Sequence, residues 1–70
     1  MNLEHLSTAL DADTRARIAL SSGLTFDNVT AAIRAENVLL DLCVKAGMSY
    51  DETDSREWAS IRVAQWLCAA

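Results

Sequence analysis

The stretch Gly23-Leu24-Thr25-Phe26-Asp27 decides the fold of this chain, because it returns as Gly47-Met48-Ser49-Tyr50-Asp51. Each copy reads glycine, aliphatic, hydroxyl, aromatic, aspartate, and stands between two stretches of helical periodicity. Glycine suits the left-handed position that ends a helix, an aliphatic residue suits the apolar contact after it, and a hydroxyl residue is a favoured N-cap. The repeat predicts helix, tight corner, helix, tight corner, helix.

Between the two copies, residues 26–45 are predicted to form the middle helix. Thr25 is its expected N-cap, and Leu24 is placed to pack against Val29 as a hydrophobic staple. Lys45 lies near the negative end of the helix dipole and can pair with Asp41, four residues earlier. One apolar stripe of this helix contains Phe26, Val29, Ile33, Leu40 and Val44.

The outer helices are less regular. In residues 3–21 the apolar stripe is interrupted by Asp13, Thr14 and Arg17, which favours a short helix followed by a second one over a single kinked helix. After the second copy of the repeat, two capping boxes compete, and the last helix is expected to be established by Ser55. The prediction is therefore an all-α bundle of three to four helices with glycine-containing corners.

Composition indicates one small domain, residues 1–70, with a thin core. Hydrophobic residues make up 51% of the chain, but twelve of them are alanines, which remove little surface from water. The absence of proline and the presence of only two glycines favour helices throughout. Because the chain carries more apolar helical surface than 70 residues can cover, we expect a homodimer or a bound protein partner.

The predicted self- or partner-binding surface involves the second half of the middle helix and the last helix. Trp58, Arg62 and Trp66 are spaced at i, i+4 and i+8, so they share one face and the guanidinium can lie between two indole rings. Such a cluster is typical of a binding hot spot, but the scarcity of other large side chains favours tryptophans that fill an alanine-rich core or a self-interface. The residues assigned to this surface are Val38, Leu39, Leu42, Trp58, Arg62, Trp66 and Leu67.

Four acids, Asp51, Glu52, Asp54 and Glu57, form a cluster before and within the start of the last helix. Acids at this position cap free N–H groups and complement the helix dipole. The alternative interpretation is an acidic docking patch for a basic partner.

Charge and motifs restrict the classes of function. The net charge of −4 opposes non-specific binding to nucleic acid or to anionic membranes. No catalytic constellation, metal-ligand spacing or phosphate loop is found, so we expect no enzyme activity, no cofactor and no metal. Without a bilayer-spanning apolar run or a signal-peptide pattern, the chain is expected to be cytoplasmic.

Residues 15–34 resemble a helix-turn-helix motif, in which Ala19, Gly23, Leu24, Thr25 and Val29 occupy the small, turn, aliphatic, cap and core positions. That resemblance implies a DNA-reading helix from Phe26 to Arg34, with Asn28 and Arg34 as the contacts. The phrase Gly-Leu-Thr-Phe before an Ala-Ala-Ile-Arg helix is also similar to ubiquitin-associated three-helix domains, which would require a loop after Ala35.

These observations lead to two hypotheses of function. The first is a non-enzymatic protein-protein interaction module, a small acidic helical regulator or inhibitor. In size and charge it is similar to phage- or plasmid-encoded inhibitors such as anti-CRISPR proteins. The alternative is a small helix-turn-helix transcriptional regulator.

Overall fold

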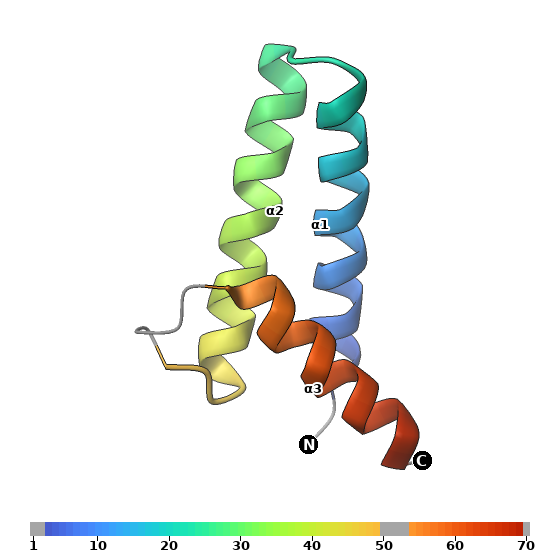
Figure 1. The fold of residues 1–70 in the computed structure, drawn as a ribbon. Helices are drawn as coiled ribbons and strands as arrows, with labels where there is room; N and C mark the ends of the chain where they lie inside the picture. The colour runs from blue at the N-terminus through green and yellow to red at the C-terminus, as the bar shows by residue number, and fades with distance from the viewer. Residues whose placement is uncertain (1–2, 50–53, 70) are drawn as a thin grey trace.

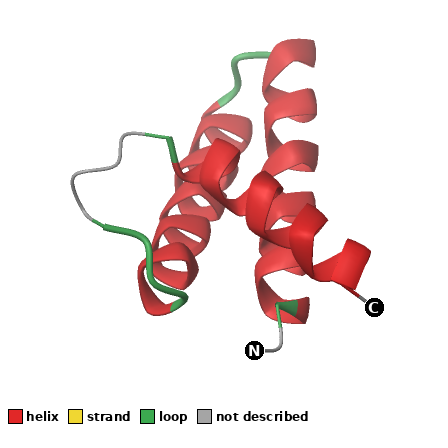
Figure 2. Cartoon of the chain, turned by 60° about the horizontal axis from the view of Figure 1, so that its bottom comes forward, coloured by secondary structure: helices red, strands yellow, loops and turns green. Residues whose placement is uncertain are grey.

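The computed structural model describes residues 3–49 and 54–69, and these residues form three α-helices. Helix α1 spans Glu4–Ser22, α2 spans Phe26–Lys45 and α3 spans Ser55–Ala69. Figure 1 shows α1 and α2 side by side and antiparallel, with α3 lying across one end of the pair. Figure 2, viewed from that end, places α3 in front of the hairpin.

Helix α1 is continuous, so the predicted break within residues 3–21 is wrong. The polar residues that interrupt its apolar stripe are accommodated without a break. Asp13 is buried and paired with two arginines, and the Thr14 hydroxyl donates to the Leu10 carbonyl at 3.0 Å. The interruption of the stripe therefore marks a polar cluster in the core.

Helices α1 and α2 pack through faces in which alanines are interspersed with larger side chains. The face of α1 that is buried or half-buried repeats at spacings of three and four, and so does the corresponding face of α2. Small side chains at such positions let two helix backbones approach closely. The packed residues of α1 are Leu6, Ala9, Asp13, Ala16 and Leu20, and those of α2 are Asn28, Ala32, Ala35, Leu39 and Leu42; four of these ten are alanines.

The core lies at the end of the hairpin that α3 covers. Its buried side chains come from all three helices and from Met48, in the connection after α2. Half-buried Leu3, Leu10 and Trp58 pack against this cluster. The buried apolar residues are Leu6, Ala9, Leu39, Cys43, Met48, Ala59 and Val63.

The two copies of the repeated phrase adopt different conformations. Gly47 has a φ of 114°, and the N–H groups of Gly47 and Met48 donate to the carbonyls of Val44 and Cys43, which is the pattern of a Schellman motif. Gly23 instead is extended, with φ −179° and ψ 132°, so the left-handed conformation expected there is wrong. Any residue can adopt the backbone conformation of Gly23, whereas that of Gly47 favours glycine.

The aliphatic residues of the two copies also differ. Met48 is buried, as the apolar contact of a Schellman motif requires. Leu24 is 84% exposed and so does not form the staple with Val29 that the sequence suggested. The first corner, residues 23–25, therefore places an aliphatic side chain in solvent.

The predicted N-cap and end of α2 are confirmed. The Thr25 hydroxyl accepts from the N–H of Asn28 at 3.1 Å, and α2 ends at Lys45, whose ammonium pairs with Asp41 at 2.9 Å. Helix α3 begins at Ser55 as predicted.

Candidate interaction site

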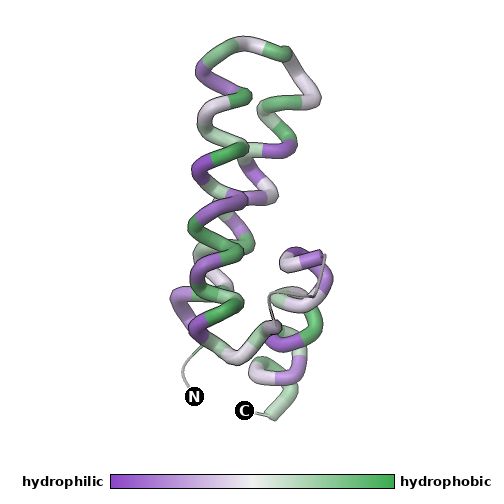
Figure 3. Tube along the Cα trace, turned by 90° about the vertical axis from the view of Figure 1, so that its left-hand side faces the viewer, coloured by the Kyte–Doolittle hydropathy of each residue, from purple (hydrophilic) through white to green (hydrophobic). Residues whose placement is uncertain are grey.

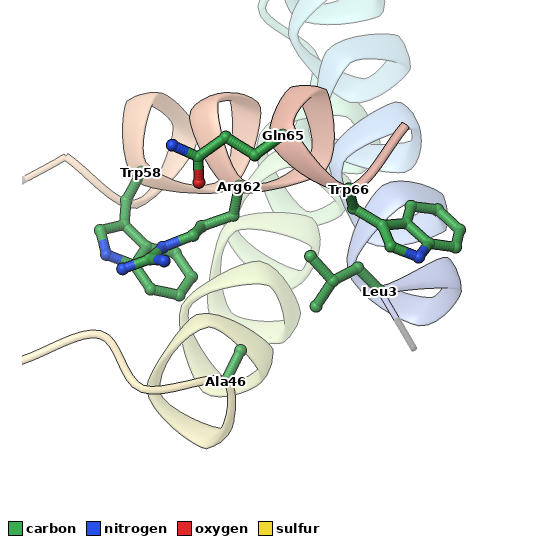
Figure 4. Close-up of a pocket in the computed structure, with 6 residues that line it drawn as sticks. All are labelled: Leu3, Ala46, Trp58, Arg62, Gln65 and Trp66. Carbon is green, nitrogen blue, oxygen red and sulfur yellow. The ribbon is translucent and has the colours of Figure 1, made fainter. Parts of the chain in front are cut away.

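The exposed face of α3 carries an arginine stacked on a tryptophan. The Arg62 guanidinium carbon lies 5.0 Å from the centroid of the Trp58 ring, within the range of a cation–π contact. In Figure 4 the guanidinium lies over Trp58, whereas Trp66 lies away from it, next to Leu3. The guanidinium therefore stacks on one indole, although the spacing would also allow it to lie between both rings.

A pocket of about 380 Å³ opens between the two indoles. It is formed by α3 together with the residue before α1 and the residue after α2. Each of its lining residues keeps part of its surface in solvent, so the pocket is an open depression. We call it the indole pocket; it is lined by Leu3, Ala46, Trp58, Arg62, Gln65 and Trp66.

The other residues assigned to the predicted interface are not on one surface. Leu39 is fully buried and Leu42 packs against the core, so neither offers a face to a partner. Val38 and Leu67 are 54% and 62% exposed, on α2 and α3 respectively. Sequence periodicity placed Leu39 outside because the apolar residues of this half of α2 surround the helix.

A second apolar surface lies at the end of the hairpin away from α3. Its side chains are large, and they belong to the connection between α1 and α2 and to the first half of α2. Figure 3 shows apolar segments continuing along α2 as far as the connection. We call this the distal apolar surface; it consists of Leu24 (84% exposed), Phe26 (84%), Val29 (38%) and Ile33 (54%).

On α2, the spacing of Phe26, Val29 and Ile33 puts these side chains on one stripe. This is the apolar stripe noted in the sequence, but the helix turns a different, alanine-containing face toward α1. Sequence analysis located the apolar excess in the second half of α2 and in α3. It missed the distal surface because large side chains are normally assigned to the core.

Of the acidic cluster, the structure describes Asp54 and Glu57, while Asp51 and Glu52 lie outside the described residues. The Asp54 carboxylate accepts from the Glu57 N–H at 3.0 Å, which is the hydrogen bond of an N-cap. Asp54 therefore stabilises the start of α3.

The two residues assigned to DNA contact have different surroundings. The Asn28 amide donates to the carbonyls of Ala19 and Gly23, at 3.2 and 2.9 Å, and thereby ties the start of α2 to the end of α1. Arg34 is exposed. The antiparallel arrangement of α1 and α2 also differs from the 90–120° angle of a helix-turn-helix.

The strongest polar cluster of the described residues was missed by the sequence analysis. Asp13 is 1% exposed, and its Oδ2 accepts from the Arg17 Nε at 2.9 Å and from the Arg56 guanidinium. Arg56 also donates to the Thr14 hydroxyl at 3.0 Å, and so connects α3 to α1. The signal in the sequence was a charged residue at a core position, since such a residue needs a partner.

The two cysteines are reduced and lie in different environments. Cys43 is buried, with its Sγ 3.5 Å from the Ser55 carbonyl, and Cys68 is exposed. Burial raises the pKa of the Cys43 thiol, because the thiolate loses solvation. Within residues 3–49 and 54–69, no three potential ligands gather as a metal site would require.

Among the described helices, none combines the length and apolarity needed to cross a bilayer. Comparisons with protein-family models, with curated proteins and with solved structures found no match to this chain.

Proposed function

We propose that this chain is a non-enzymatic interaction module that associates with itself and docks on a protein partner through helical surfaces. The observation that supports this most is the distal apolar surface, where Leu24 and Phe26 are each 84% exposed. Monomeric soluble proteins rarely present several large apolar side chains together, and such surfaces commonly mark protein interfaces.

The proposal includes a homodimer in which the exposed stripe of α2 from Phe26 to Ile33 meets its counterpart. A large apolar side chain contributes about 1.5–3 kcal/mol when it becomes fully buried. Burial of the distal surface on both copies is therefore worth on the order of 10 kcal/mol. This is comparable to the cost of bringing two molecules together, so the dimer should dissociate on dilution.

The decisive experiment is light scattering with mass determination across a dilution series. The expected mass is near twice that of the monomer at high concentration. Ile33→Lys should give a monomer with unchanged helicity. Asn37→Lys adds the same charge at an exposed polar position of the same helix and should leave the mass unchanged. A wild-type monomer at every concentration would refute self-association.

We further propose that the module acts in the cytoplasm as a small regulator or inhibitor. The DNA-binding alternative has less support, because the Asn28 amide is engaged by the carbonyls of Ala19 and Gly23 and the chain is acidic. An electrophoretic shift assay with mixed DNA at low salt separates the two functions. Binding that weakens steeply with salt would refute the interaction module.

A further inference from the structure

We propose that the indole pocket receives a large apolar side chain of a partner protein, and that Arg62 pairs with a carboxylate next to it. The occupant is thus a segment in which an aromatic or branched residue adjoins an aspartate or glutamate. This inference rests on the proposed function, since it assumes a protein partner, and it specifies the chemistry of that partner.

The shape of the pocket fits one such side chain. Its volume of about 380 Å³ is at the lower end of the range of ligand sites. Trp58 and Trp66 form two of its walls, with Leu3 and Ala46 between them (Figure 4). Aromatic walls of this kind favour an apolar or aromatic occupant.

The charge of the pocket comes from Arg62. Among the residues that the structure describes, no carboxylate pairs with this guanidinium, whereas Arg17 and Arg56 both pair with Asp13. Stacking on Trp58 holds the guanidinium at the pocket in place. Its N–H donors are therefore available for an external acceptor, and a carboxylate matches their geometry in a bidentate pair.

An open pocket favours a protein segment over a free acid. Small-molecule sites bury about 70–90% of the surface of the ligand. Here Arg62 and Gln65 are exposed, and the remaining lining residues are half-buried, so the walls enclose a small ligand on few sides. A polypeptide covers the open side with its own backbone. It also contacts Ile61, which is 51% exposed and lies on α3 three residues after Trp58.

The overall charge of −4 opposes an acidic partner, but the contact pair outweighs it. A carboxylate in contact with Arg62 interacts with it at the shortest possible distance, and the partner that covers the pair shields it from solvent. Salt screens exposed charges that lie beyond the Debye length of about 8 Å, and it screens a covered contact pair much less. A single carboxylate next to an apolar residue is therefore favoured over an extended acidic segment.

Both tryptophans of the chain line the pocket, so intrinsic tryptophan fluorescence reports its occupancy. The probes are two capped peptides, acetyl-Leu-Phe-Glu-amide and acetyl-Leu-Phe-Gln-amide, which differ only in the charge. The glutamate peptide should change the emission saturably at millimolar concentrations. The glutamine peptide should bind at least about fivefold more weakly.

Two variants test whether Arg62 is the residue that distinguishes the glutamate peptide from the glutamine peptide. Arg62→Gln should abolish the difference between the peptides, with helicity retained because Arg62 is exposed. Arg34→Gln removes an exposed arginine of α2 and should preserve the difference. Equal binding of the two peptides to the wild type, discrimination that survives in Arg62→Gln, or no saturable change would each overturn the inference.

Phenylacetate, a free aromatic acid, tests the source of the occupant. If it binds as tightly as the glutamate peptide, the site takes a small molecule and the assignment to a protein segment is overturned. The failures of the two proposals are distinguishable. Ile33→Lys should abolish self-association and leave the peptide titration unchanged, whereas loss of peptide binding in a chain that still dimerises removes only this inference.

Discussion

Replacing Arg56 with methionine tests whether the buried Asp13 carboxylate holds α3 on the hairpin. Asp13 is 1% exposed, so it cannot recruit bulk water when Arg56 is lost. Its Oδ1 already lacks a hydrogen-bond partner in the structure, and its Oδ2 would retain only Arg17. Breaking a buried ion pair by removing one partner costs about 3–5 kcal/mol.

Arg56→Met should lower the free energy of unfolding by about 2–3 kcal/mol, at or slightly below the lower end of that range. The loss is reduced because Arg17 remains and the Arg56 side chain is 30% exposed. A domain of this length has a stability of roughly 3–10 kcal/mol, so the variant loses a substantial part of it. The melting temperature should fall by about 10–20 °C. Arg17→Met removes an i,i+4 partner that is itself 51% exposed and leaves the pair of Arg56 with Asp13 in place, so it should cost only about 0.5 kcal/mol.

The double variant Asp13→Ala with Arg56→Met gives the sharpest result. It removes the buried charge together with its partner, and replacing a buried pair by apolar residues is often neutral or stabilising. The double variant should therefore be more stable than Arg56→Met alone. Urea denaturation followed by far-ultraviolet circular dichroism measures all variants. A loss under about 0.5 kcal/mol in Arg56→Met, or simple additivity in the double variant, would refute the argument.

Further measurements test the packing of the core and the corners. Leu39→Asp buries a charge without a partner and should abolish helicity, rather than yield a folded monomer. Gly47→Ala should cost about 1–2 kcal/mol in urea denaturation because of its positive φ, whereas Gly23→Ala, in extended backbone with its nearest neighbours 3.9 Å away, should cost nothing. In thiol labelling, Cys68 should react in the native state and Cys43 only after unfolding. Burial raises the pKa of the Cys43 thiol above the value of about 8.5 that a cysteine has in the unfolded chain. The stability contributed by the neutral, buried thiol is therefore complete below that pH and should decrease as the pH rises further.

Local signals predicted the elements of the fold well. Thr25 as a cap, Lys45 as the last residue of α2 and Ser55 as the start of α3 depend on interactions within one helical turn, which the sequence displays directly. Periodicity likewise predicted that α2 is uninterrupted. These features need no knowledge of how the helices pack.

The errors concern partners that are distant in sequence. Asp13 was interpreted as a break in α1 because its partner, Arg56, is 43 residues away. The repeated phrase predicted equal roles for Gly23 and Gly47, yet the chain uses a Schellman motif at one position only. The same holds for the site residues. Their spacing placed Trp58 and Arg62 on one face of α3, but it could not show which indole the guanidinium contacts.

The small-residue packing of the hairpin explains why large apolar side chains remain at its surface. With Ala32 and Ala35 toward α1, the residues of α2 on its other apolar stripe, Phe26 and Ile33, have no partner helix. Helix α3 provides a second layer only at the opposite end, where Arg56 and Asp13 connect it to α1. A chain selected only for its own stability would gain by exchanging these exposed residues for polar ones at little structural cost. Their presence is explained more simply if another protein surface covers them.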